Sequence, residues 1–197
     1  MSKILIIAPH PDDESLGCGG TILKYISEGH DVYWVICTTV NDDFGWDESK
    51  MNQREIEIEE IGKAYGFKQI FKLNLPSSKL ETIPFKNLIE NFREIIIQIE
   101  PDSVYIPFSH DVHTDHQVIS QVFNSFMKWF RYPSIHSVLM YETLSETNFN
   151  FGISEKYSPN TYVDISQFIE KKIEICNMYA SEIQRHPFPR SKDSINA

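Results

Sequence analysis

A short apolar run that gives way to a cluster of charged residues is the feature that most restricts how this chain can fold. Residues 4–8 are Ile-Leu-Ile-Ile-Ala, and Pro9 ends the run. Four ionisable side chains follow within five positions: His10, Asp12, Asp13 and Glu14. A buried strand, a charged loop and then a helix is how α/β proteins present functional groups. The adjacent carboxylates repel one another, and a metal ion would offset that repulsion.

The rest of the sequence alternates between strand and helix patterns. Apolar runs predict strands at residues 3–8, 31–38, 69–72, 102–108, 135–142 and 162–165. Helical spacing of apolar residues predicts helices at residues 21–28, 50–65, 85–99, 117–130 and from 166 onward, with a Gly-rich turn before the first. This order predicts a single Rossmann-like α/β domain over residues 1–197, with a mainly parallel sheet, helices on both faces and a C-terminal tail at about 186–197.

A second polar cluster follows the fourth predicted strand and contains His113, Asp115 and His116. In a doubly wound sheet of order 3-2-1-4-5-6, the first and fourth strands are neighbours, and ligands bind between their carboxyl ends. We therefore expect the two clusters to meet, although they lie about a hundred residues apart. Phe44 and Trp46, in the loop after the second strand, are equally suited to line a substrate site or to anchor that loop.

The spacing within each cluster indicates a metal site. His10 and Asp13 are three residues apart, as are His113 and His116. A set of two histidines and one aspartate leaves the fourth position of a tetrahedral zinc ion open, as in catalytic zinc sites. Zinc lowers the pKa of bound water to roughly 7 and polarises a carbonyl oxygen.

The remaining polar residues can supply acid–base chemistry. Asp12 can take a proton from water, and the histidine of the second cluster that does not bind metal can protonate a leaving nitrogen or stabilise an oxyanion. Asp115 can hydrogen-bond a histidine and set its tautomer.

The charge and the cysteines restrict partners and location. The formal net charge of −10 argues against nucleic acid or an anionic membrane as the main partner. We see no signal peptide and no apolar run near the ~18–20 residues that span a bilayer. Cys18, Cys37 and Cys176 cannot all pair, and we expect reduced thiols in a cytoplasmic protein.

Three stretches resemble a known family. The segment 8–14 (Ala-Pro-His-Pro-Asp-Asp-Glu) with the glycines at 17–20, the motif 113–116 (His-Thr-Asp-His) and the tail motifs at 179–182 and 186–191 look like those of the LmbE-like, or PIG-L-type, zinc-dependent deacetylases. These enzymes remove acetyl groups from N-acetylated amino sugars such as N-acetylglucosamine conjugates. The resemblance implies zinc binding by His10, Asp13 and His116, a general base at Asp12, an acid or oxyanion-stabilising group at His113, a histidine tuned by Asp115, and substrate contact by Arg54.

The same residues also allow alternative interpretations of the site. Some family members carry a tyrosine where this chain has Asp111, so oxyanion stabilisation from that position is in question. The glycine-rich stretch also suits a non-catalytic nucleotide-binding module, and the acidic residues suit a metal-dependent phosphoesterase. Another divalent ion such as Fe²⁺ could replace zinc, and the sequence leaves open the exact amino-sugar substrate and whether the chain forms a homo-oligomer.

Overall fold

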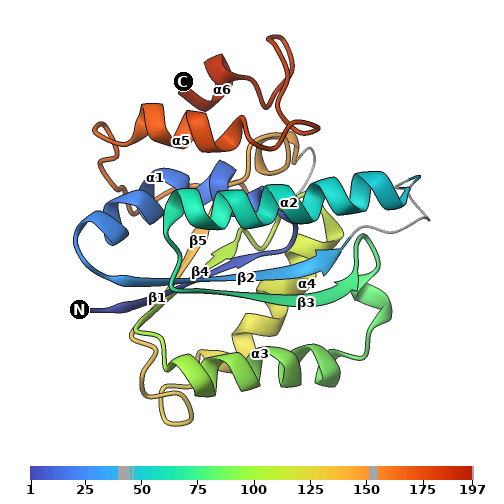
Figure 1. Cartoon of the computed structure of the whole chain (residues 1–197). Coiled ribbons are helices and arrows are strands. Elements are labelled where there is room, and N and C mark those ends of the chain that lie inside the picture. Colours follow the sequence, from blue (N-terminus) through green and yellow to red (C-terminus); the bar gives the residue numbers. More distant parts are fainter. Residues whose placement is uncertain (40–44, 46, 151–154, 197) are drawn as a thin grey trace.

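A five-stranded parallel sheet forms the centre of the protein, as a computed structural model that describes residues 1–39, 45, 47–150 and 155–196 shows (Figure 1). The strand order is β3-β2-β1-β4-β5. The strands are β1 (Lys3–Ala8), β2 (Asp31–Thr39), β3 (Gln69–Pro76), β4 (Ser103–Pro107) and β5 (Ser137–Tyr141). Phe44 and Trp46 lie outside the described residues, so their two roles stay untested.

Helices cover both faces of the sheet (Figure 1). One face carries α1 (Asp13–Ser27), α2 (Glu48–Tyr65) and α5 (Ile169–Cys176), with the short α6 (Lys192–Asn196) beside α5. The other face carries α3 (Phe85–Ile99) and α4 (Thr114–Phe123). Short 3-10 helices span Leu80–Thr82, Asn124–Phe126 and Thr147–Phe149. The predicted α/β class, with a parallel sheet and helices on both faces, is confirmed, whereas the single domain over 1–197 stays a prediction.

Strand β1 explains why the sheet needs two helical layers. Leu5 and Ile7 point into the core beneath α3 and α4, where Phe92 also packs. Ile4 and Ile6 point into the opposite core beneath α1 and α2. Burying one such side chain contributes about 1.5–3 kcal/mol relative to leaving it exposed. A strand with apolar side chains on both faces is therefore stable only when both faces are covered.

The first helix begins at Asp13 rather than at Thr21, so the predicted Gly-rich turn is wrong. The glycines lie inside α1, where they let other segments approach the helix closely. A Cβ at Gly17 would lie 2.3 Å from Cδ2 of Tyr141, and a Cβ at Gly20 would lie 2.5 Å from Cδ1 of Ile165. This packing outweighs the low helix propensity of glycine.

Other differences concern the ends of elements. Residues 162–165 form no strand, because Ile165 packs on Gly20 instead of pairing with the sheet. Strand β3 runs on to Pro76, past the predicted end at residue 72, because it stays paired with β2. Helix α4 ends at Phe123 instead of 130 and continues as a 3-10 turn. Within the described residues, no helix is both long and apolar enough to cross a membrane.

We predict that Gly17→Ala lowers the free energy of unfolding by about 1–2 kcal/mol in urea titrations. The added methyl group meets the buried ring of Tyr141 and the carbonyl oxygen of Glu142, and this overpacking exceeds the gain in helix propensity. Ser27→Ala, at an exposed position of the same helix, is the control and should change stability by less than about 0.5 kcal/mol. Equal or higher stability of Gly17→Ala would contradict the packing role.

Candidate metal centre

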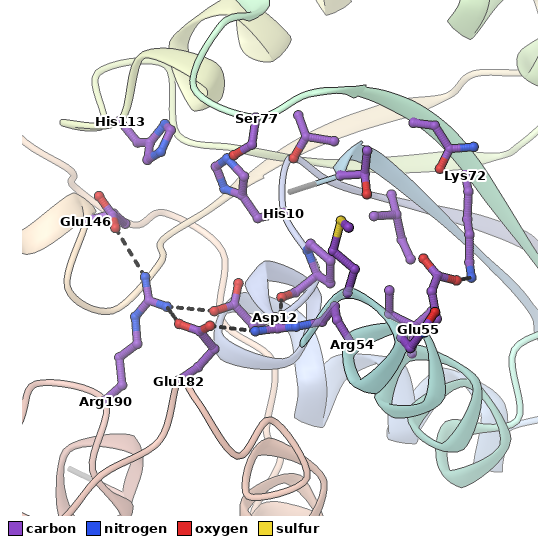
Figure 2. Close-up of a pocket in the computed structure, with 18 residues that line it drawn as sticks. His10, Asp12, Arg54, Glu55, Lys72, Ser77, His113, Glu146, Glu182 and Arg190 are labelled. Atoms are coloured by element: carbon purple, nitrogen blue, oxygen red, sulfur yellow. Dashed lines mark hydrogen bonds and ion pairs between the residues drawn. The ribbon is translucent and has the colours of Figure 1, made fainter. Parts of the chain in front are cut away.

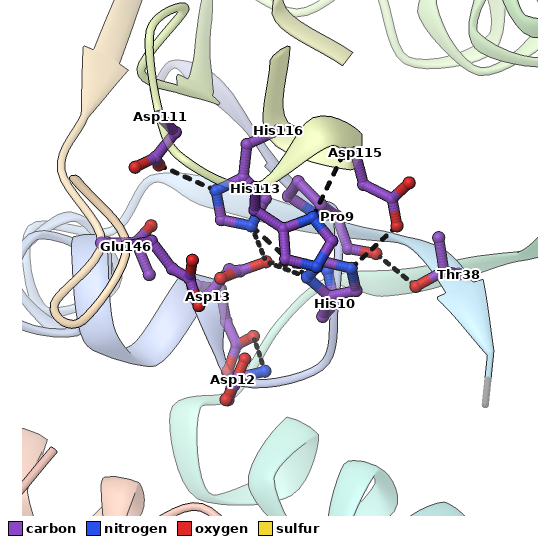
Figure 3. Close-up of polar contacts among 12 residues, drawn as sticks. Pro9, His10, Asp12, Asp13, Thr38, Asp111, His113, Asp115, His116 and Glu146 are labelled. Carbon is purple, nitrogen blue, oxygen red and sulfur yellow. Dashed lines mark hydrogen bonds and ion pairs between the residues drawn. The ribbon is translucent and has the colours of Figure 1, made fainter. Parts of the chain in front are cut away.

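The two polar clusters meet at the carboxyl ends of β1 and β4, which confirms the predicted neighbours (Figure 3). His10 lies in the turn after β1, and Asp13 is the first residue of α1. His113 is the residue that caps the N-terminus of α4, and His116 lies in the first turn of that helix. Because β1 and β4 pair in parallel, both turns emerge at the same edge of the sheet.

Three donor atoms form a nearly equilateral triangle at this edge. Nδ1 of His10 and Nε2 of His116 each lie 3.2 Å from Oδ2 of Asp13. The two ring nitrogens are 3.4 Å apart. A tetrahedral zinc ion with bonds of about 2.0–2.1 Å holds its ligand atoms about 3.3 Å apart. These three side chains therefore fit a tetrahedral metal ion with one position left open.

Carboxylates orient both histidines of this triangle. Nε2 of His10 lies 3.0 Å from Oδ2 of Asp115, and Nδ1 of His116 lies 2.9 Å from Oδ2 of Asp111. Asp115 and Asp111 are fully buried, and Asp115 also accepts hydrogen bonds from the backbone N–H groups of Ser78 and Leu80. In each ring, one nitrogen is thus bonded to Asp115 or Asp111. The other nitrogen of each ring faces Asp13. The histidine partner of Asp115 agrees with the prediction from the sequence, whereas the contact of Asp111 with His116 was not predicted.

The groups of the triangle strongly influence one another's protonation. Burial lowers the pKa of His10, but hydrogen bonds to Asp115 and Asp13 outweigh this and raise it to about 9. Burial also lowers the pKa of His116, whereas the charge of Asp13 and the hydrogen bond to Asp111 raise it to about 10. Burial raises the pKa of Asp13, but the charge of His116 and the hydrogen bond to His10 hold it well below its usual range. The centre therefore favours positive charge, which suits a divalent cation.

His113 stands beside the triangle. Its ring centroid lies 4.4 Å from that of His10, and nitrogens of His10, His113 and His116 all lie within 4.8 Å of one another. Nδ1 of His113 accepts a hydrogen bond of 3.2 Å from the backbone N–H of Asp115. Burial and the neighbouring histidines lower the pKa of His113 to about 4. The neutral ring therefore carries its proton on Nε2, the nitrogen that can donate to a ligand.

Asp12 is a buried carboxylate next to the triangle. Its Oδ2 accepts a hydrogen bond of 2.6 Å from Nη1 of Arg190. Burial raises the pKa of Asp12 to about 7, although the positive charge of Arg190 opposes the shift. A carboxyl group that titrates near neutral pH is suited to exchange protons with a substrate or water.

A pocket of about 270 Å³ opens beside the centre (Figure 2). His10, Asp12 and His113 line it, together with Arg54 from α2. The pocket wall also contains Glu146, Glu182 and Arg190, which were not predicted from the sequence as site residues. Two of these lie in the tail motifs that resembled the family, and that resemblance was the signal that could have revealed them.

Arg54 faces the pocket but is already bonded to its surroundings. Nη1 donates to the carbonyl oxygen of Pro11 at 3.1 Å, and Nη2 donates to Ser181 Oγ at 2.7 Å and to Glu182 Oε1 at 2.6 Å. The guanidinium thus ties the turn after β1 to the C-terminal segment. Contact of Arg54 with substrate stays a prediction.

A parallel α/β sheet with histidines and carboxylates gathered at its switch point is the arrangement of a metal-dependent hydrolase. The family model described as PIG-L, GlcNAc-PI de-N-acetylase, matches residues 5–127, and the chain belongs to this family. The suspected family is therefore confirmed. Deacetylases of this family are in general metal-dependent, and the histidine-rich centre agrees with that property.

Individual relatives are similar over most of the chain. A diacetylchitobiose deacetylase of Thermococcus kodakarensis is 24% identical over 193 residues, which cover 92% of this chain and 70% of the relative. A probable N-acetyl-α-D-glucosaminyl L-malate deacetylase of Bacillus anthracis is 25% identical over 189 residues. This alignment covers 91% of this chain and 80% of the relative. The solved N,N′-diacetylchitobiose deacetylase from Pyrococcus horikoshii aligns with a TM-score of 0.70 and 26% identity, covering 91% of this chain and 70% of that chain.

We predict that Asp111→Ala weakens zinc binding by about 10- to 100-fold, measured by competition with a coloured chelator. The substitution removes the hydrogen-bond acceptor that orients His116. Glu28→Gln, which alters a histidine–carboxylate pair with His30 away from the centre, is the matched control and should leave zinc affinity unchanged. Unchanged affinity of Asp111→Ala would show that the contact does not support a metal ligand.

Proposed function

We propose that this protein is a zinc-dependent hydrolase that removes an acetyl group from an N-acetylated amino sugar. The observation that carries the proposal is the triangle formed by His10, Asp13 and His116, with edges of 3.2–3.4 Å, next to a pocket that Asp12 also lines. Family membership and the deacetylase relatives support the same activity.

In this proposal His10, Asp13 and His116 hold the ion. Zinc bound there would lower the pKa of water and polarise the acetyl carbonyl group. Two nitrogen ligands and one oxygen ligand suit zinc, and Fe²⁺ is the alternative that metal analysis would separate.

Asp12 is the proposed general base. Its carboxylate lies in the pocket wall and can take a proton from the attacking water. His113, with the proton of its neutral ring on Nε2, is placed to donate a hydrogen bond to the amide oxygen as negative charge develops. We therefore favour oxyanion stabilisation over general-acid catalysis for His113, with Asp115 holding His10 and, through its backbone N–H, His113.

The polar and apolar residues that line the pocket suit an N-acetylglucosamine-type substrate. Hydroxyl groups of a sugar can bond to its polar side chains, while Ile36, Ile58 and Met51 offer apolar surface to a sugar ring. Arg54 is the proposed sugar contact, and its hydrogen bonds to Pro11, Ser181 and Glu182 hold its guanidinium in the pocket wall.

The two alternative functions have less support. The glycines of the first motif lie within α1 and pack against Tyr141 and Ile165, so they form no phosphate-binding loop. Phosphoesterases of the two-metal type need a second ion. Among the described residues, one group has side chains placed to hold a metal ion, and its members are His10, His113 and His116. The family comparisons favour amide hydrolysis.

We also propose a cytoplasmic location and a small-molecule substrate in place of nucleic acid. The buried, unpaired thiols of Cys18, Cys37 and Cys176 suit a reducing compartment, and the net charge of −10 disfavours nucleic acid.

Metal analysis coupled to an acetate assay tests this function. We expect about one zinc per chain and acetate release from a panel of N-acetylglucosamine derivatives. Removal of the metal with a chelator should abolish acetate release, and added zinc should restore it. His116→Ala should lose both metal and activity. Full metal content without acetate from any member of the panel would exclude the deacetylase function.

We predict that Asp12→Asn retains zinc but lowers kcat by about 100-fold or more, because the amide cannot accept the proton. The ligand triangle does not include Asp12, so metal content measured by elemental analysis should match the unaltered protein. Acetate release at the original rate would show that another group is the base.

A further inference from the structure

Arg190 connects the C-terminal segment to the proposed base (Figure 2). Nη1 of Arg190 donates to Oδ2 of Asp12 at 2.6 Å and lies 3.3 Å from Oε2 of Glu182. Nη2 donates to Oε1 of Glu146 at 3.1 Å, and Nε donates to Oγ of Ser145 at 2.7 Å. All three guanidinium nitrogens are therefore bonded, and the Arg190 side chain is only 14% exposed.

Asp12 needs such support because its backbone is strained. Its φ of 136° lies in a region that residues other than glycine rarely adopt. The backbone N–H of Asp12 donates to Oε2 of Glu14 at 3.1 Å, and the hydroxyl of Tyr179 donates to Oε1 of the same carboxyl group at 2.8 Å. Glu14 thus holds the backbone of Asp12, and Arg190 holds its carboxylate.

We propose that Arg190 is a positioning residue that aims the carboxylate of Asp12 at the reacting water. The inference rests on the proposed function, in which Asp12 is the base. Arg190 itself acts on the reaction through Asp12, and its ion pairs with Glu146 and Glu182 hold its guanidinium in place.

The shape of the guanidinium explains why arginine is needed here. Its planar fork reaches Asp12 and Glu182 through one nitrogen, while two other nitrogens reach Glu146 and Ser145. Glu182 also pairs with Arg54, so a chain of ion pairs links α2, the C-terminal segment and Asp12. A lysine ammonium has no such fixed fork and cannot satisfy the same acceptors together.

Steady-state kinetics of Arg190→Met test the proposal, with Arg185→Met as the control from an exposed position of the same segment. We expect kcat to fall about 10- to 100-fold in Arg190→Met, because a misplacement of about 1 Å has effects of this size. We expect KM and zinc content to change by less than about twofold, and Arg190→Lys to regain part of kcat. A kcat equal to that of Arg185→Met would overturn the proposal.

The double variant Asp12→Asn/Arg190→Met separates positioning from general destabilisation. If Arg190 acts through Asp12, its loss should lower kcat by no more than about twofold once Asp12 is already replaced. If the fold loss of kcat in the double variant equals the product of the losses in the two single variants, the proposal is overturned. If Arg190→Met does not fold, Arg190→Lys is used in the same cycle, with the same two outcomes.

A crystal structure of the zinc-loaded Arg190→Met variant gives a readout that needs no activity. We expect the Asp12 carboxylate to leave its present position while the donor atoms of His10, Asp13 and His116 keep theirs. An unmoved Asp12 carboxylate would overturn the proposal. Absence of acetate release from the unaltered protein would instead reject the proposed function, and the two failures are therefore distinguishable.

Discussion

Parallel pairing of β1 with β4 is the constraint on which the candidate centre depends. Ile4 pairs with Ser103 and Ile6 pairs with Tyr105, so both strands end at the same edge of the sheet. His10 and Asp13 leave this edge from β1, while His116 leaves it from β4 through the start of α4. Because both strands are buried and packed by two helical layers, the donor atoms are held by the rigid part of the fold.

The buried carboxylates at this edge of the sheet each require hydrogen-bond donors or a positive charge nearby. An unpaired buried charge is strongly destabilising, so each acid must have donors. Asp13 is bonded to both histidines of the triangle, and Asp115 accepts from the backbone of residues 78 and 80. Asp12 is paired with Arg190 from the far end of the chain. The position of the Asp12 carboxylate is therefore coupled to the docking of the C-terminal segment.

The glycines of the first motif illustrate a limit of local patterns. Three glycines within four residues predict a turn, since glycine has low helix propensity. In the folded protein Gly17 and Gly20 lie in α1 because Tyr141 and Ile165 approach it too closely for any side chain. Ile165 also shows why residues 162–165 are not a strand: its apolar side chain packs on a helix. Both errors arise because packing partners distant in the sequence overrode local preference.

The sequence by itself determined the alternation of strands and helices, the parallel sheet and the two clusters that contain His10, Asp13 and His116, because apolar periodicity and residue spacing are local properties. Only the tertiary structure decided which further side chains form hydrogen bonds with the residues of these two clusters. Asp111 bonds His116 from the turn before α4, and Arg190 bonds Asp12 across 178 residues of sequence. Such pairings depend on the directions of side chains after the layers have packed, and no local pattern encodes them.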